Sequence, residues 1–245
     1  MPYTCNGTSS YLNVASTPVS AVPLTLACWF RTGTTGVQRG LVSIGDTAGD
    51  ADEFLLSVSA TETVQALTRR SSSASAESTT GLSVDTWHHG CAVFNSATDR
   101  RAFIDGGSKG TEATSKTPVG LDTISVGRRA RLSSGAFFDG DIAHVAIWNA
   151  TLLDGEVAAL AKGFPVMRMR RNSLLAYFPL FGGSPSPDLT GGGYSLTLVD
   201  SPTVLTSQPP RIASPYAFAS YLAGGATPPA GGGGSSHYRM LMGIG

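Results

Sequence analysis

Asp85-Thr-Trp-His-His-Gly-Cys-Ala-Val-Phe-Asn95, followed by Asp99-Arg-Arg-Ala-Phe-Ile-Asp-Gly-Gly107, is the stretch that decides the fold of this chain. Residues 87–94 are rich in aromatic and β-branched side chains, and the small polar residues after them favour a turn. Residues 102–104 return as a second strand, which ends at Asp105-Gly106, a pair typical of type I′ turns. Apolar side chains occupy both faces of the first strand, so the sequence predicts a central hairpin that is covered on both sides.

Composition limits the class of protein. The chain has 245 residues, enough for one large β domain or for a medium domain with an appendage. Charged residues make up 14% and the formal net charge is +0, so no global field attracts nucleic acid or an anionic membrane. The densest basic group is Arg168, Arg170 and Arg171. The segment at residues 166–170 is interpreted as a half-exposed strand or connector with its basic face in water. Arg128, Arg129 and Arg131 come next. No stacking aromatics are interleaved with these arginines, so we predict no nucleic-acid partner and no membrane partner.

The cysteines and the N-terminus bear on the compartment. Cys5, Cys28 and Cys91 are odd in number and lie in apolar strand patterns, so we expect free buried thiols and no zinc site. The N-terminus has no basic region followed by an apolar core, and no apolar run is long enough to span a bilayer. We therefore expect a soluble protein that is made in a cytoplasm and is not secreted through a signal peptide.

Strand patterns recur over the first 200 residues, at residues 3–14, 24–31, 40–45, 54–59, 64–68, 123–127, 137–149, 172–180 and 194–198. Ser71 to Thr80 is interpreted as a Ser/Thr/Ala surface loop without core content. One helix is expected at residues 152–163, capped by Asp154 and ended by Gly163. Its buried face should consist of Val157, Leu160, Ala161 and Phe164.

These segments resemble laminin G-like domains, a family of the concanavalin A-like lectin/glucanase sandwiches. The residues that carry the resemblance are Tyr11-Leu-Asn-Val14, the Trp29-Phe30 strand, Trp87-His-His with Val93-Phe94, Phe103-Ile-Asp-Gly106, and the closing signature Phe138-x-Gly140-x-Ile142-x-x-Val145-x-Ile147-Trp148. The resemblance covers roughly residues 3–200. It implies an all-β, two-sheet antiparallel jelly-roll sandwich (residues 1–200) with one short helix. The rest of the chain is predicted from its composition to be an extended C-terminal arm (residues 201–245).

Residues 201–245 differ in composition from the rest of the chain. Paired prolines and the run Gly231 to Gly234 argue against an independent core. Apolar side chains nevertheless recur, and we expect them to form an assembly interface: Tyr216, Phe218, Tyr221, Leu222, Tyr238, Met240, Leu241, Met242 and Ile244. The alternative is that residues 216–222 pack on their own sandwich and that the end of the chain is disordered.

Two groups of residues have side chains of the kinds that bind metal ions. The acidic loop Asp46, Asp50, Asp52 and Glu53 has the oxygen ligands that calcium prefers, and laminin G-like and pentraxin-like domains often bind calcium at one edge of the sandwich. Its spacing matches no Asp-x-Asp-x-Asp-Gly loop, so a solvated loop without cofactor is the favoured interpretation. His88 and His89 point opposite ways on a strand and cannot share a metal. One should be partly buried and hydrogen-bonded, and the other should face solvent.

Catalysis finds little support. A sandwich glucanase needs two carboxylates about 5–9 Å apart. The glutamates Glu53, Glu62, Glu112 and Glu156 are scattered, without a Glu-x-Asp-x-Glu alternation. No Gly-x-Ser-x-Gly motif supports Ser/His/Asp chemistry, and no catalytic residue is predicted.

Three functions remain. The layout, a laminin G-like sandwich, then Leu174-Leu-Ala-Tyr-Phe-Pro-Leu180, then a Pro/Gly-rich end, resembles small virion proteins of tailed bacteriophages. This resemblance implies a non-enzymatic structural protein, a capsid decoration or tail-associated protein, whose partners are other virion proteins or further copies of itself. The alternative is a lectin-like adhesion module that binds a surface glycan. A glycoside hydrolase is the least favoured function.

Overall fold

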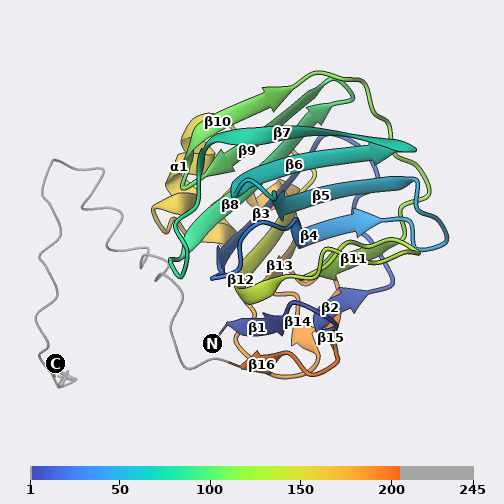
Figure 1. Ribbon diagram of the computed structural model, residues 1–245, viewed down its shortest axis with the longest axis vertical. Coiled ribbons are helices and arrows are strands. Elements are labelled where there is room, and N and C mark those ends of the chain that lie inside the picture. Colours follow the sequence, from blue (N-terminus) through green and yellow to red (C-terminus); the bar gives the residue numbers. More distant parts are fainter. Residues whose placement is uncertain (1, 205–245) are drawn as a thin grey trace, which may run out of the picture. The chain divides into compact units, whose positions relative to one another are not determined.

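A computed structural model describes residues 2–204, and these form a sandwich of two antiparallel sheets (Figure 1). Sheet A has the strand order β10-β9-β8-β3-β12-β1-β16, and β13 also pairs with β12. Its strands are β1 (Tyr3–Asn6), β3 (Leu24–Arg31), β8 (His88–Ser96), β9 (Asp99–Ile104), β10 (Gly107–Glu112), β12 (Asp139–Trp148), β13 (Leu174–Phe178) and β16 (Thr203–Val204).

Sheet B has the order β14-β15-β2-β11-β4-β5-β6-β7. Its strands are β2 (Tyr11–Val14), β4 (Arg39–Gly45), β5 (Asp52–Val58), β6 (Thr63–Arg70), β7 (Ser72–Gly81), β11 (Thr123–Val126), β14 (Ser186–Pro187) and β15 (Ser195–Val199). The helical elements are α1 (Asp154–Ala161) and two 3₁₀ turns, η1 (Val166–Arg168) and η2 (Arg171–Ser173). The predicted all-β jelly-roll sandwich is confirmed.

The main core lies between the sheets. Alternate residues of β8 enter it, and Phe94 lies with its ring centroid 5.0 Å from that of Phe54 on β5. The predicted hairpin is central, because β8 pairs with β3 on one side and β9 on the other. The next turn, which joins β9 to β10, has φ of 51° at Asp105 and 75° at Gly106, as a type I′ turn requires.

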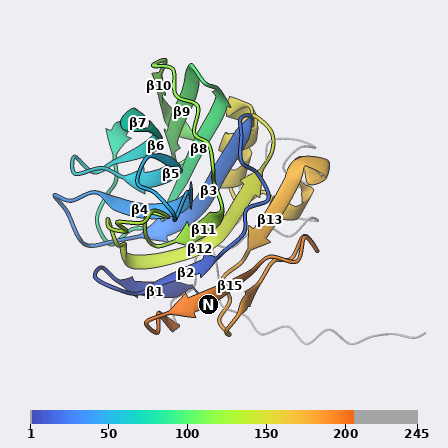
Figure 2. The same ribbon diagram turned by 90° about the vertical axis from the view of Figure 1, so that its right-hand side faces the viewer.

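A second apolar cluster covers the other face of sheet A, the face away from sheet B, which we call the outer face. Cys91 and Val93 of β8 pack there with side chains of α1, η1 and β13. In Figure 2 the segment with α1 and β13 lies on this side of the sheet. The indole of Trp148 is fully buried in this cluster and donates a hydrogen bond of 2.9 Å to the carbonyl oxygen of Met169. The expectation that the hairpin is covered on both faces is confirmed.

β12 carries an irregularity that shapes this outer face. One edge of β12 pairs with β3, while β1 and β13 share its other edge. The register with β3 shifts between Ala143 and Ala146, and His144 has φ of 53°. Such a β-bulge redirects a side chain and bends the strand locally. His144, Ala146 and Trp148 alternate along the strand and line the outer face, whereas Ile142, on the far side of the bulge, lies in the main core with Val145.

Two local predictions are wrong. Ser71 to Thr80 is not a loop, because residues 72–81 form β7, with Ala76 and Ser78 buried. Asp154 is not the helix cap. Leu153 occupies the N-cap, its N–H donates a hydrogen bond of 2.7 Å to Glu156, and Asp154 instead accepts from Lys109.

The cysteine prediction is confirmed: Cys5, Cys28 and Cys91 are all free and buried. Burial raises the pKa of Cys28 and Cys91, which keeps both thiols protonated and unreactive at neutral pH. Within residues 2–204, no helix has the length and apolar character needed to cross a membrane.

Candidate functional site

The outer face of sheet A is covered over only part of its length. α1 and the segment after it cover the part around Cys91 and Trp148. Beyond this cover, Trp29 and Arg31 of β3 are half-buried, as is Trp87 next to β8. The guanidinium of Arg31 lies 5.8 Å from the centroid of the Trp87 ring. We call Trp29, Arg31, Trp87 and the exposed Phe181 the open strip.

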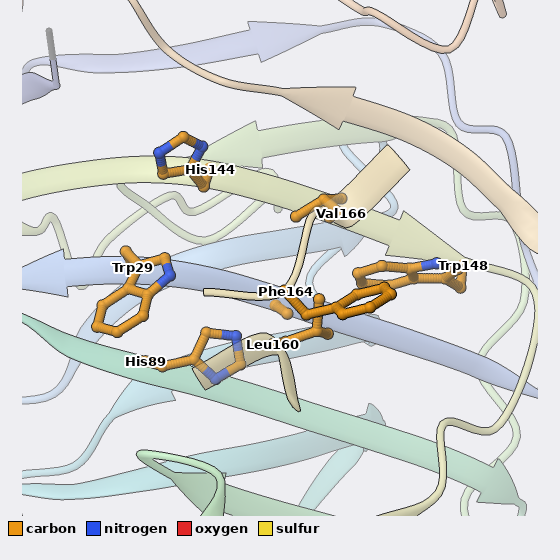
Figure 3. Close-up of a pocket in the computed structure, with 9 residues that line it drawn as sticks. Trp29, His89, His144, Trp148, Leu160, Phe164 and Val166 are labelled. Atoms are coloured by element: carbon orange, nitrogen blue, oxygen red, sulfur yellow. The ribbon is translucent and has the colours of Figure 1, made fainter. Parts of the chain in front are cut away.

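A recess lies where the open strip meets the covered part (Figure 3). Ala27 and Ala146, which are register partners on β3 and β12, contribute two of the smallest side chains that line it. Larger side chains surround them: Trp29, His89, His144, Trp148, Leu160, Phe164 and Val166. The cavity volume of the recess is about 10 Å³, room for about one water molecule, so the recess is a shallow depression rather than a pocket that encloses a ligand.

Two imidazoles line the recess from β8 and β12, the two strands that flank β3, so they lie on either side of Trp29 (Figure 3). His89 is 3% exposed, its ring meets Trp29 edge-on at 5.4 Å, and its Nδ1 has no hydrogen-bond partner among the described residues. His144 is 6% exposed, and its Nδ1 lies 2.8 Å from the hydroxyl of Tyr177. Burial lowers the pKa of both to about 4. Both rings are therefore neutral at pH 7, and each offers one donor and one acceptor.

His88 points to the opposite side of β8. Its ring packs 6.0 Å from that of Phe30, and its Nδ1 lies 2.7 Å from Oδ2 of Asp105. This hydrogen bond raises the pKa of His88, against the effect of burial. The predicted opposite orientation of His88 and His89 is confirmed. The expectation that one of them faces solvent is wrong, because the covering segment and Trp29 bury His89 as well.

The carboxylates of the acidic loop are engaged mainly by different partners, although Arg131 lies 3.8 Å from Asp50 and 3.7 Å from Glu53. Asp46 accepts from the backbone N–H of Ala48, and Asp50 accepts from Ser133. Asp52 pairs with Arg70, and the fully buried Glu53 pairs with Arg129. Within residues 2–204, no three His, Cys, Asp or Glu side chains are grouped so that they could hold a metal ion. Glu53 thus anchors the segment after β11 to sheet B.

Glu53→Gln should lower the free energy of unfolding by about 2 kcal/mol, because a buried guanidinium loses the charge that compensates it. Glu53 is 0% exposed and the Arg129 side chain 11%. Urea unfolding at pH 7 measures the loss. The matched control is Asp50→Asn, because the Asp50 side chain is 40% exposed and its variant should be nearly as stable as the native protein. Equal effects of both substitutions would contradict the anchoring role.

The arginine groups contact side chains of this chain. Arg128 lies 3.6 Å over the ring of Tyr11, and Arg170 pairs with Glu156 at 2.7 Å. Residues 166–168 form a 3₁₀ turn, so the interpretation of this segment as a connector is confirmed and the strand alternative is wrong.

The glutamates also have separate partners. Glu62 pairs with Arg39, and Glu112 accepts from the backbone N–H of Thr114. Glu77, which the sequence interpretation left out, accepts from Gln65 and Thr63 on the outer side of sheet B. No two of these contacts share a partner.

The predicted assembly residues lie outside the described residues and stay predictions: Tyr216, Phe218, Tyr221, Leu222, Tyr238, Met240, Leu241, Met242 and Ile244. The sequence interpretation missed the recess. Its available signals were Trp29 and His89, which fall on the same face of two strands, and the predicted helix face with Leu160 and Phe164. It had no signal for the bulge at His144.

The family follows from this fold. Residues 6–158, more than half of the chain, match the family model described as the concanavalin A-like lectin/glucanases superfamily, a laminin G-like family, and the chain belongs to it. A comparison with curated proteins gives no significant match.

Solved structures with a similar fold include carbohydrate-binding proteins. The CBM40 module of the Ruminococcus gnavus IT-sialidase, bound to α2,3-sialyllactose, is 17% identical with a TM-score of 0.54, over 66% of this chain and 98% of that chain. A putative carbohydrate-binding protein of Bacteroides ovatus is 14% identical with a TM-score of 0.54, over 83% of this chain and 62% of that one. The heptameric SAP-like pentraxin of Limulus polyphemus is 15% identical with a TM-score of 0.51, over 65% and 81%. At these identities the likeness establishes the shared fold alone.

Proposed function

We propose that this chain is a carbohydrate-binding domain without catalytic activity, and that it binds a glycan on the outer face of sheet A, across the open strip and the mouth of the recess. The observation that carries the proposal is that half-buried aromatic side chains, Trp29 above all, lie next to two neutral imidazoles around a small recess. A sugar ring has an apolar face of C–H groups and a rim of hydroxyls. Aromatic rings suit the face, and a few fixed polar groups suit the rim.

Two further observations support this proposal. The similar folds include domains whose names state carbohydrate binding, one of them solved with a bound sialyllactose. The glutamates of this chain are held by separate basic or hydroxyl partners, which disfavours the paired acid and base of a glycosidase. Because the acidic loop carboxylates are already engaged, we expect binding without calcium, unchanged by a chelator.

The test is a glycan array followed by titration calorimetry on the best ligand. Trp29→Ala should weaken binding by at least about 10-fold, or about 1.4 kcal/mol, through loss of the stacking surface. The matched control is Leu132→Ala, an exposed apolar residue that does not line the recess, which should bind as the native protein does. Equal affinities of the two variants, or no bound glycan on the array, would contradict the proposal.

We also propose that the domain is displayed on a larger assembly, a phage virion, to which residues 201–245 attach it. In support, β16 pairs with β1, so the chain leaves the sandwich from the end strand of sheet A. Light scattering after size exclusion, on the full chain and on residues 1–204, tests the arm. An oligomeric full chain beside a monomeric truncation supports attachment through residues 205–245, and two monomers argue against self-assembly through them.

A further inference from the structure

A row of side chains crosses the outer face of sheet A at the end that the covering segment leaves open. Arg31 of β3 and Asp141 of β12 are register partners. The residues next to them in the two strands, Phe30 and Ile142, lie in the main core, so strand alternation directs Arg31 and Asp141 to the outer face. The ring of Trp87 lies on the other side of Arg31, 5.8 Å from its guanidinium. The open strip therefore ends in a cation and an anion that are direct neighbours.

Asp141 binds the guanidinium of Arg31 through two nitrogens. Oδ2 of Asp141 accepts hydrogen bonds from Nε at 2.7 Å and from Nη2 at 2.6 Å. Its Oδ1 accepts a third hydrogen bond, of 2.7 Å, from the hydroxyl of Thr4 on β1. The Asp141 side chain is 4% exposed and that of Arg31 is 31% exposed. The charge of Arg31 is thus compensated from within the sheet, and a carboxylate on a ligand would have to compete with Asp141 for it.

Two further carboxylates lie beside this row, along the loop that follows β3. The Thr34 hydroxyl donates a hydrogen bond of 2.5 Å to Asp139, and the carbonyl oxygen of Thr32 accepts one of 2.9 Å from the backbone N–H of Asp85. Asp85 and Asp139 are both exposed. The imidazoles of the recess add no positive charge at pH 7, because burial lowers the pKa of both to about 4. The field at this end of the outer face therefore repels an anion.

We propose that the open strip selects uncharged glycans over acidic ones, and that Asp141 sets this selectivity by keeping the charge of Arg31 compensated. This inference rests on the proposed glycan-binding function and specifies the class of its ligand. The rings of Trp29 and Trp87 can pack against the apolar face of an uncharged sugar. The carboxylate of a uronic or sialic acid would lose water at this surface without gaining an uncompensated cation.

The experiment compares sugars that differ in one carboxylate, on the full chain at pH 7 and low ionic strength. The pairs are methyl glucoside with methyl glucuronide, methyl galactoside with methyl galacturonide, and lactose with α2,3-sialyllactose. In each pair that binds, the uncharged sugar should bind at least about 10-fold tighter, because like charges that meet at an interface are strongly unfavourable. The preference should shrink as salt is added, because salt screens the exposed carboxylates.

Two variants should move this preference in opposite directions. Asp141→Asn removes the charge but keeps an oxygen for the Thr4 hydroxyl, so the acidic sugar should bind tighter and the preference should fall to less than about 3-fold. Arg31→Gln leaves Asp141 without its cation, so the preference should grow. The matched control is Asp50→Asn, which removes the same charge from the loop before β5 of sheet B and should leave the preference unchanged. Thermal unfolding checks that each variant is folded, so that one remains informative if the other is not.

The outcomes separate this inference from the proposed function. If acidic and uncharged sugars bind equally well and Trp29→Ala weakens both, the selectivity is overturned and glycan binding on this face stands. A preference that stays the same in Asp141→Asn and in Arg31→Gln also overturns the inference, because the ligand charge is then not sensed at this row. If none of the sugar pairs binds and the glycan array shows no ligand, the proposed function fails as well.

Discussion

Acidification from pH 7 to pH 4 should remove about 3 kcal/mol of folding stability for each of His89 and His144. Burial lowers the pKa of both rings from 6.5 to about 4 in the folded protein. The unfolded chain therefore binds more protons than the folded one between these values. Stability rises with pH across this window, is fully present above about 6.5, and is lost as the pH falls toward 4.

His88 acts in the opposite sense. Its hydrogen bond to Asp105 raises its pKa in the folded state, so its contribution is present below the ordinary histidine pKa and is lost as the pH rises through the folded value. The net acid loss is thus smaller than the sum for the two recess imidazoles. A single-residue comparison removes this complication.

The measurement is the free energy of unfolding in urea at pH 7 and at pH 4.5, for the native protein and for His89→Gln. Glutamine is neutral at both values, so the variant should lose about 2 kcal/mol less than the native protein over this range. His88→Gln is the matched control, and it should steepen the acid loss rather than reduce it. Identical pH dependence in the native protein and His89→Gln would show that His89 is exposed to water.

Trp148→Ala should lower the free energy of unfolding by about 4 kcal/mol, the upper range for a large-to-small substitution in a core. The indole is 0% exposed and packs with Val157 and Leu160 of α1. Its loss creates a cavity between sheet A and the covering segment, and it also leaves the carbonyl oxygen of Met169 without its donor. Urea unfolding at pH 7 gives the loss.

Two control variants separate the loss of apolar volume from the loss of the hydrogen bond. Trp148→Phe keeps most of the apolar volume but not the N–H, so it should cost about 1–2 kcal/mol. Leu153→Ala removes an exposed side chain at the start of α1 and should stay within about 0.5 kcal/mol. A loss below about 1 kcal/mol for Trp148→Ala would mean that the covering segment is not anchored by this residue.

The parts of the fold that the sequence predicts are those in which local pattern and tertiary environment agree. β8 has apolar residues on both faces because each face meets a different cluster, and that pattern is visible without a structure. β7 fails this test, since it is mostly Ser and Ala and lacks the large β-branched and aromatic residues that mark a strand. Its neighbour in the other sheet is equally hard to predict: a Cβ on Gly110 of β10 would collide with the backbone of Glu77.

The candidate site was less predictable than the fold. Its residues come from β3, β8, β12 and the segment after β12, which lie far apart in sequence. The strand alternation predicts correctly that His88 and His89 diverge, but it cannot show that Trp29 and the covering segment bury His89. Strand alternation also places His144 on the face of Ala146 and Trp148, but it places Ile142 there too, and the bulge moves Ile142 to the main core. The sequence interpretation did not place the helix N-cap at Leu153. The side chain that accepts the hydrogen bond from the Leu153 N–H is that of Glu156, three residues downstream.

The close approach of β10 to β7 has a consequence for crowded surroundings. These are the terminal strands of the two sheets on the same side of the sandwich, and the hydroxyls of Thr80 and Ser108 are hydrogen-bonded at 2.7 Å. Terminal strands with free backbone groups are templates for aggregation between neighbouring molecules. Here each terminal strand shields the other, so we expect that two copies of the domain can touch along this flank without joining their sheets.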